Sequence, residues 1–308
     1  MPRYYLGVDG GGTNCRVRLA DADLVTLADA GSGRSNLQIE AGEAAFRSIS
    51  EGTRLVFEKA GIDYAETANT YACFGMAGGR LESARRAFEN RPWPFAGVKV
   101  FDDIDIARAG AHGGEDGAVI IVGTGSAALA MVDGKRHQCG GWGFHIGDQM
   151  SGAILGRELL RRTVEANDGL VSGSALTEAV RDKFGGSNDD IMAWSFPHDD
   201  RPPFPASGAP QTLLGRAPAE FGALMPLFFE YFEKGDPVAK ELMELQLSFI
   251  DNYVRWFKAR GVTRMAAVGG FGARLYPLMT ARYGEFIVPL QHEPLHGAVI
   301  LAKQIFAA

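Results

Sequence analysis

The sequence has few cysteines and no long hydrophobic run. Three of its 308 residues are cysteines, and Cys15, Cys73 and Cys139 lie far apart without a CxxC spacing. This pattern argues against a zinc ribbon and favours a reducing compartment. No apolar run approaches the length of a membrane span, and the first ten residues lack the apolar core of a signal peptide. We therefore expect a cytoplasmic protein.

An excess of positive charge is also missing. The net charge is −6, and lysines and arginines occur singly or in pairs. Such a chain lacks the basic patch expected of a protein that binds nucleic acid or an anionic membrane. With 46% hydrophobic and 22% charged residues, it has the composition of a globular protein long enough for two domains. Small-molecule chemistry is the expectation.

Three familiar motifs fail on their context. GTGSAA at 123–128 matches the dinucleotide fingerprint, but residues 129–132 are too few for the helix that must follow it. The Gly-Lys pair at 134–135 lacks the rest of a Walker A loop. HEPLH at 292–296 matches the HExxH zinc pattern, but Pro294 interrupts the helix on which both histidines would have to lie.

Residues 5–19 organise the rest of the chain. An apolar run ends in Asp9, Gly10 to Gly12 and Thr13 follow, and a strand of alternating apolar and charged residues returns. The pattern predicts a hairpin whose glycines adopt positive φ and present N–H groups to phosphate, while Thr13 adds a hydroxyl. Asp9 would repel phosphate, so we expect it to hold Mg²⁺. A plain glycine-rich hairpin is the alternative.

The same pattern returns at 117–135, which predicts a second phosphate turn and an internal repeat of two domains. Between and after the two turns, strands and helices alternate, as in an α/β fold. We place the domains at 1–112 and 113–294, with a helix at 295–308 closing the first. Further strands are expected at 21–27, 70–79 and 98–103, and a strand running into glycines at 265–275. Helices are expected at 43–59, 81–90, 153–165 and 237–259, and loops at 140–152 and 196–211.

The two turns, DGGGT and GTGS, resemble those of the ATP-binding superfamily that includes actin, hexokinase and the heat-shock chaperone ATPases. Within it, the order of short motifs is similar to N-acetylglucosamine kinases and glucosamine kinases of the BadF/BadG type. These motifs are GRSN at 33–36, AGG at 77–79, the carboxylates at 102–103, GTGS at 123–126, GGWG at 140–143, GDQ at 147–149, GDP at 235–237, VGG at 268–270 and GA at 297–298. The resemblance spans the chain and implies two ribonuclease H-like α/β domains around a central cleft for nucleotide and sugar.

The resemblance also implies an ATP- and Mg²⁺-dependent kinase that phosphorylates the 6-hydroxyl of N-acetylglucosamine or glucosamine, and a homodimer. The residues implied for ATP are Asp9 with the metal, Gly11, Gly12, Thr13, Gly123, Thr124, Gly125, Ser126, Gly269 and Gly270. Those implied for the sugar are Asn36, Gly78, Asp103, Gly141, Trp142, Gly143 and Asp148. Asp103 is the expected catalytic base. Asp102 also lies at the end of the strand expected at 98–103, but alternation would send the two side chains to opposite faces.

Several alternatives stay open. Gln149 and Met150 depart from the N-acetylglucosamine kinase pattern, whereas Trp142 agrees with it, so the acceptor could be either amino sugar or another hexose. Trp142 could instead be core packing, and Asn36 a helix cap. Two other classes share the fold. An ATP-driven activator of acyl-CoA dehydratases needs a cysteine pair for an iron-sulfur cluster, and no such pair is recognisable. For a sugar-sensing regulator, we expect too little chain before Asp9 for a DNA-binding domain.

Overall fold

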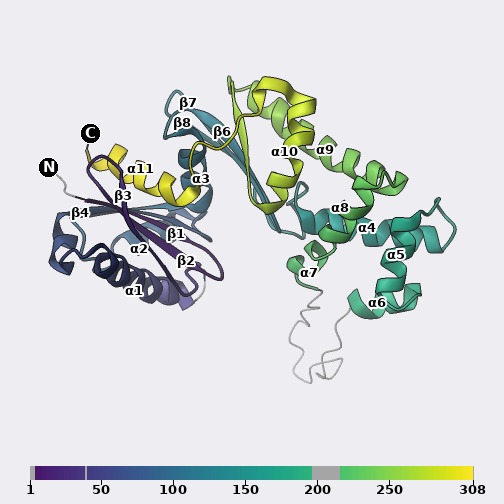
Figure 1. Ribbon diagram of the computed structural model, residues 1–308, viewed down its shortest axis with the longest axis horizontal. Coiled ribbons are helices and arrows are strands. Elements are labelled where there is room, and N and C mark those ends of the chain that lie inside the picture. The colour runs from purple at the N-terminus through teal and green to yellow at the C-terminus, as the bar shows by residue number, and fades with distance from the viewer. Residues whose placement is uncertain (1–3, 39, 196–215, 308) are drawn as a thin grey trace.

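The computed structural model describes residues 4–38, 40–195 and 216–307, and in this part of the chain the strands form two mixed sheets (Figure 1). One has five strands in the order β3-β2-β1-β4-β5, and the other has four in the order β8-β7-β6-β9. The strands are β1 Tyr4–Gly10, β2 Cys15–Asp21, β3 Thr26–Ser32, β4 Thr70–Met76, β5 Gly97–Asp102, β6 Gly117–Val122, β7 Ser126–Val132, β8 Lys135–Gly140 and β9 Met265–Val268. The loop expected at 196–211 lies outside the described residues.

Helices cover both sheets. The helices packed on the five-stranded sheet are α1 Glu43–Ala60, α2 Glu82–Glu89, α3 Asp103–His112 and α11 Pro294–Phe306, with 3-10 turns at Glu40–Gly42 and Tyr64–Asn69. The remaining helices are α4 Gly152–Asn167, α5 Ala175–Lys183, α6 Asn188–Ser195, α7 Pro218–Gly222, α8 Met225–Glu233, α9 Pro237–Lys258 and α10 Gly270–Tyr283, with a 3-10 turn at Gly284–Phe286. We call the two groups, each with its sheet, the first lobe and the second lobe.

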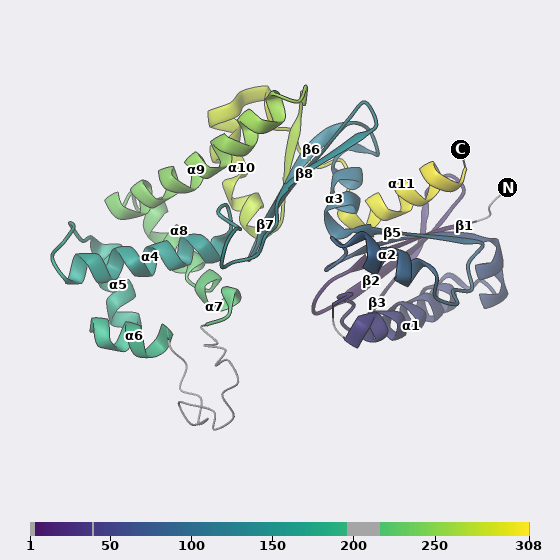
Figure 2. The same cartoon turned by 180° about the vertical axis from the view of Figure 1, so that it is seen from behind.

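In the first lobe, alternation along the strands supplies two apolar faces. Leu6 and Phe74 face α1, whereas Tyr5 and Cys73 belong to the cluster that α3 and α11 complete. Helix α1 therefore lies on one face of the sheet, and α3 and α11 lie on the other (Figures 1 and 2). A Cβ on Gly7 would lie 2.8 Å from the carbonyl oxygen of Leu295, so only glycine allows α11 to pack this closely on β1.

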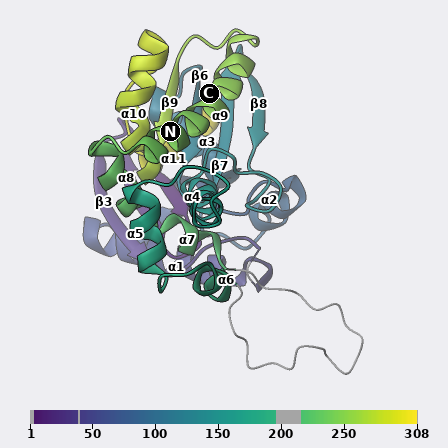
Figure 3. The ribbon, with the colours of Figure 1, turned by 90° about the vertical axis from the view of Figure 1, so that its right-hand side faces the viewer.

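The second lobe places its larger core between its sheet and a layer of helices. Phe228 of α8 and Phe257 of α9 are fully buried in it. Figure 3 looks along the long axis of the molecule from the side of this lobe, where α4 and α5 lie in front. No helix among the described residues is long and apolar enough to cross a membrane.

The chain crosses between the lobes at 113–116 and again at 288–293, so that α11 returns to the first lobe (Figure 1). There α11 crosses α3 backbone to backbone. A Cβ on Gly297 would lie 2.0 Å from the carbonyl oxygen of Ile106, and one on Gly110 would lie 2.4 Å from that of Glu293. From this arrangement we propose two domains, 1–112 with 295–308 and 113–294.

Two local expectations were wrong. The strand expected at 21–27 is split, because the Oδ1 atom of Asp21 accepts the N–H groups of Asp23 and Val25, both at 2.9 Å, and closes a turn there. Asp103 does not end β5. It is the first residue of α3, and Asp102 is the N-cap residue, so strand alternation does not determine where these two side chains point. The expected helices at 43–59 and 237–259 are confirmed as α1 and α9.

The buried N-cap of α9 gives a stability prediction. One carboxylate oxygen of Asp236 accepts the N–H groups of Val238 and Ala239, and the two oxygens also accept bonds from Ser174 and Leu176 at the start of α5. Asp236→Ala would leave these donors unpaired, and we expect it to lower the free energy of unfolding in urea by about 2 to 4 kcal/mol. The exposed cap Asp63, which accepts one N–H, is the control. Equal losses in Asp236→Ala and Asp63→Ala would contradict this account.

Candidate active site

The turn that the sequence predicts to bind phosphate connects β1 to β2, and we call it and its counterpart between β6 and β7 the first and second phosphate turns. The first phosphate turn is closed by the N–H of Gly11, which donates to the carbonyl oxygen of Asn14 at 2.9 Å. The expectation of positive φ was wrong for Gly10 to Gly12, none of which adopts it. Gly10 is needed for space instead. A Cβ on Gly10 would lie 2.7 Å from the sulfur of Met76, whereas one on Gly12 would meet nothing within 4 Å, so exposed Gly12 leaves its backbone open to a ligand.

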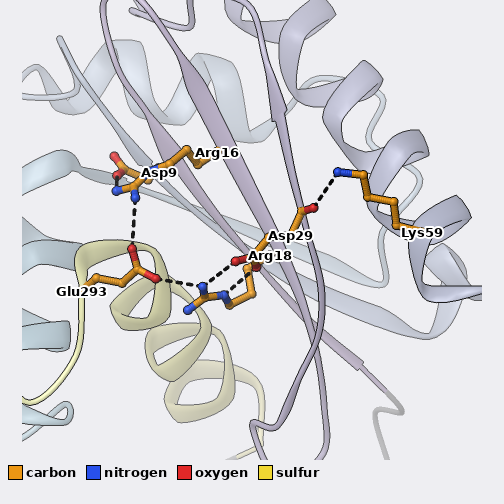
Figure 4. Close-up of polar contacts among 6 residues, drawn as sticks. All are labelled: Asp9, Arg16, Arg18, Asp29, Lys59 and Glu293. Carbon is orange, nitrogen blue, oxygen red and sulfur yellow. Dashed lines mark hydrogen bonds and ion pairs between the residues drawn. The ribbon is translucent and has the colours of Figure 1, made fainter.

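Asp9, at the end of β1, belongs to a chain of ion pairs (Figure 4). Arg16 on β2 donates one N–H to Asp9 at 2.6 Å and another to Glu293, the N-cap residue of α11, at 3.0 Å. Arg18 donates to the second oxygen of Glu293 at 2.8 Å and makes a bidentate pair with Asp29. The last helix is thereby tied to the phosphate hairpin of the first strands.

The donor set around Asp9 fits a magnesium ion shared with a ligand. Among the described residues, no three histidine, cysteine or carboxylate side chains converge as a closed metal site. Mg²⁺ usually takes one or two protein carboxylates and completes its octahedron with water and phosphate oxygens. The Asp9 side chain is 21% exposed and lies beside an open phosphate turn, so it could hold the ion of a Mg-nucleotide.

Asp103 lies at the N-terminus of α3, at the edge of the sheet where parallel β1, β4 and β5 all end. Its carboxylate accepts the N–H of Ile104, which favours the charged form. Burial, and then the negative charges of Asp102, Asp9 and Asp105, outweigh this bond and raise the pKa of Asp103 to about 7. A carboxylate with this pKa can take up and release a proton near neutral pH.

Asp102 and Asp105 have partners in the second lobe, unlike Asp103. Arg136 on β8 makes a bidentate pair with buried Asp105 at 2.7 and 2.9 Å. Gln138, also on β8, donates to Asp102 at 3.3 Å and accepts from Arg136 at 2.8 Å. The pKa of Asp102 is raised by burial and by Asp105, with Gln138 and Arg136 acting against the rise. Asp102 and Asp105 therefore join the lobes.

The second phosphate turn, between β6 and β7, also has open backbone. A Cβ on Gly123 would meet nothing within 4 Å, and the exposed Thr124 follows it. The hydroxyl of Ser126 is buried without a hydrogen-bond partner in the described structure. Gly269 packs behind the turn at φ +101°, where a Cβ would lie 2.5 Å from the carbonyl oxygen of Val122. Only glycine fits there.

A cavity of about 640 Å³ opens beside this turn. Gly123 and Thr124 contribute to its lining, and Gly152 and Gly270 bring the N-termini of α4 and α10 to it. The rest of its lining is mainly apolar: Ala219, Gly222, Ala223, Met225, Pro226, Phe229, Phe271 and Arg274. An apolar cavity next to helix N-termini suits a planar base attached to phosphates.

The residues expected to bind sugar fall into two groups. In the first lobe, Asn36 lies against Gly78, where a Cβ would be 2.5 Å from the Asn36 oxygen. The same oxygen accepts the N–H of Gln38 at 2.8 Å. Asn36 is therefore a turn residue and not the cap of α1, whose N-cap is Gly42.

The second group lies on residues 141–151, between β8 and α4, which we call the 141–151 loop. Trp142 is 61% exposed, so it is not core packing. Gly141 donates to the carbonyl oxygen of Ser126 at 3.0 Å. Asp148 is buried and accepts the N–H groups of Ser126 and Gly143, which lower its pKa against the larger effect of burial. Asp148 thus joins this loop to the second phosphate turn.

Sequence reasoning missed several residues of the site. Arg16 and Glu293 were not predicted, because their pairing depends on α11 returning to the first lobe. Phe271 and Arg274 follow Gly270 at positions that line the cavity, and their proximity to the VGG motif was an available signal. In the described residues, no hydrogen bond or ion pair joins the first phosphate turn to the second. Each turn is held by its own lobe.

Comparison with known proteins agrees with this architecture. A model of the BadF/BadG/BcrA/BcrD ATPase family matches residues 6–302. The chain is 30% identical to a glucosamine kinase of Vibrio cholerae over 97% of this chain and 95% of the relative. A candidate N-acetylglucosamine kinase from Chromobacterium violaceum has a TM-score of 0.79 at 30% identity, covering 97% of this chain and 99% of that one.

A more distant structure supports the fold alone. It is a ROK-family glucokinase from Streptomyces griseus, solved with glucose and AMPPNP, with a TM-score of 0.55 at 17% identity over 98% of both chains. The expected two-sheet α/β fold of the actin and hexokinase type is confirmed. Since the family model extends over nearly the whole chain, the protein belongs to the BadF/BadG/BcrA/BcrD ATPase family.

Proposed function

We propose that this protein is an ATP-dependent kinase that transfers the γ-phosphoryl group to the 6-hydroxyl of an amino sugar, N-acetylglucosamine or glucosamine. The single observation that carries the proposal is Asp103. Its carboxylate has a pKa near 7 and stands at the sheet edge that also carries the first phosphate turn. A kinase needs one group to accept the proton of the attacking hydroxyl, and a carboxylate of this kind suits that role.

The other proposed roles follow from position. Gly11, Gly12 and Thr13 would hold the phosphates from the first lobe, and Gly123, Thr124, Gly125 and Ser126 from the second. Gly269 and Gly270 would shape the adenosine side of the cavity, where Phe271 and Arg274 also lie. Asp9 would hold Mg²⁺, which supplies charge neutralisation at the phosphates when bound. The chain's own contribution is mostly positioning and electrostatic stabilisation.

For the acceptor we propose Asn36, Gly78 and Asp103 from the first lobe, with Gly141, Trp142, Gly143 and Asp148 from the second. The names of the relatives support an amino sugar, since one is a glucosamine kinase and another a candidate N-acetylglucosamine kinase. The activator class finds less support. Cys15 and Cys73 are buried and Cys139 is half-buried, whereas a cluster between subunits needs thiolates at the surface.

The experiment is a coupled assay of ADP release with Mg-ATP and each of glucosamine, N-acetylglucosamine, N-acetylmannosamine and glucose. A thermal-shift panel of the same sugars with Mg-ADP reports binding without turnover. We expect turnover and stabilisation with at least one of the first two sugars. ATP hydrolysis that none of the four sugars accelerates would refute the kinase proposal.

The two adjacent carboxylates should differ in their effect on turnover. Asp103→Asn keeps a hydrogen-bonding side chain but cannot accept the proton, so we expect a fall of roughly 10²-fold to 10⁴-fold in kcat with a smaller change in KM. Asp102→Asn can still form a hydrogen bond with Gln138, so it should lower kcat far less. Steady-state kinetics compares the two variants. The assignment fails if Asp103→Asn retains near-normal turnover or if Asp102→Asn is the inactive one.

The raised pKa of Asp103 predicts the pH dependence. The base acts in its ionised form, so kcat should fall as the pH drops through about 7. The measurement is kcat at saturating sugar and Mg-ATP between pH 5.5 and 8.5, taken as roughly the range over which such a group titrates. This fall in kcat toward acidic pH should be absent from the residual activity of Asp103→Asn. If the fall persists in that variant, the titration belongs to another group.

The open glycines predict where ATP binds. A Cβ on Gly12 or Gly123 would meet no protein atom within 4 Å, so Gly12→Val and Gly123→Val should fold normally but obstruct the phosphates. We expect each to weaken Mg-ATP binding at least tenfold in isothermal titration calorimetry, about 1.4 kcal/mol. Gly31→Val is the control, because exposed Gly31 on edge strand β3 is also uncrowded. ATP affinity equal to the control in both variants would refute the two-turn site.

A further inference from the structure

Arg80 connects the two lobes at the sugar side of the site. It lies in the turn after β4, directly behind the AGG motif of the first lobe. Its guanidinium carbon stands 3.9 Å from the ring centroid of Trp142 in the second lobe. The Nη1 atom of Arg80 also donates to the carbonyl oxygen of Gly140 at 2.7 Å. The Arg80 side chain therefore makes a cation–π contact with Trp142 and a charged hydrogen bond with Gly140, two neighbouring positions of the second lobe.

The surroundings of Arg80 are built for this contact. Gly141 adopts φ +71°, and a Cβ there would lie 3.0 Å from Nη1 of Arg80, so glycine leaves room for the guanidinium. On the first lobe, Arg85 donates to the carbonyl oxygens of Gly79 and Arg80. These two bonds hold the turn from which Arg80 extends. The second lobe thus leaves space for the guanidinium at Gly141, and hydrogen bonds from Arg85 hold the turn that carries Arg80 in the first lobe.

The contact also reaches the second phosphate turn. Gly141 donates to the carbonyl oxygen of Ser126, and Asp148 accepts N–H groups of Ser126 and Gly143. A displacement of the 141–151 loop would therefore also displace the second phosphate turn. Trp142 remains 61% exposed although Arg80 covers part of its ring, which leaves indole surface on which a sugar can pack.

We propose that Arg80 is a positioning residue for the acceptor, which fixes the 141–151 loop and the Trp142 ring against the first lobe. This inference rests on the proposed sugar-kinase function for its effect on the acceptor. The base Asp103 and the residues Asn36 and Gly78 belong to the first lobe, whereas Trp142 belongs to the second. Arg80 sets the distance between these two halves of the acceptor site, so it governs sugar binding more than the chemical step.

The kinetic test is Arg80→Met, which keeps the length of the side chain but loses the cation and its N–H donors. We expect KM for the sugar to rise about tenfold or more, with kcat and KM for ATP within about twofold of the wild type. Arg80→Lys keeps the charge and a donor but lacks the planar group that stacks on Trp142. Its KM for the sugar should therefore lie between those of the wild type and Arg80→Met. Calorimetric Kd values for the sugar should change in parallel.

The chain offers a matched control. Arg260 stacks on Trp256 at 3.8 Å and donates to the carbonyl oxygen of the same residue at 3.0 Å. This pair lies within the second lobe. Arg260→Met removes an arginine–tryptophan stack of the same kind without touching the contact between the lobes, and it should leave the KM for the sugar unchanged.

Hydrogen exchange tests the contact without any substrate. In Arg80→Met, peptides covering residues 140–147 should exchange faster than in the wild type, whereas Arg260→Met should not change them. The inference is overturned if exchange in 140–147 is unaltered, if Arg80→Met leaves KM unchanged, or if its loss appears in kcat alone. A wild-type protein that neither turns over nor binds any of the four sugars would refute the proposed function, while the exchange comparison would still decide the role of Arg80.

Discussion

The close crossing of α3 and α11 is the contact on which the site geometry depends. Gly297 and Gly110 let the two helices approach backbone to backbone, and a Cβ at either would overlap a carbonyl group. The crossing fixes the start of α3, which carries Asp103. It also fixes Glu293 at the start of α11, which holds Arg16 beside Asp9. Packing between two glycines thus places the proposed base and the proposed metal ligand relative to each other.

The carboxylates at this edge of the first lobe are distinguished by their partners. Asp9 pairs with Arg16, Asp105 with Arg136, and Asp102 with Gln138. Among its described neighbours, Asp103 receives only the N–H of Ile104. A carboxylate with a strong cation partner would hold its charge and be a poor proton acceptor. Asp103, which has no such partner among the described residues and has a pKa raised to about 7, can change protonation near neutral pH.

Polar contacts join the lobes where the acceptor is proposed to bind, in addition to the apolar packing of α3 on β6, β7 and β9. Arg136 and Gln138 reach from β8 to the start of α3, and Arg80 reaches from the first lobe to Trp142. In the described residues, no such bond links the two phosphate turns. A nucleotide that contacts both turns would add the missing connection, which is how ligands draw two domains together.

The sequence by itself determined the two hairpins, several of the helices and the family, because these depend on local patterns. Alternation and glycine position identified the hairpins at 5–19 and 117–135, and the helix expected at 237–259 is α9. The order of short motifs identified the family. The sequence identified the carboxylate pair at 102–103, but it could not determine where each side chain points, since the chain turns from β5 into α3 between the two residues.

Only the tertiary structure decided which distant residues meet. Arg16 and Glu293 are separated by 277 positions, and Arg80 reaches Gly140 across 60. No local pattern encodes such pairs, because they form only when α11 returns to the first lobe and when β8 packs against α3. The pKa of Asp103 likewise depends on burial and on three charges from other positions. Sequence patterns predict elements and motifs, whereas packing sets distances and charges.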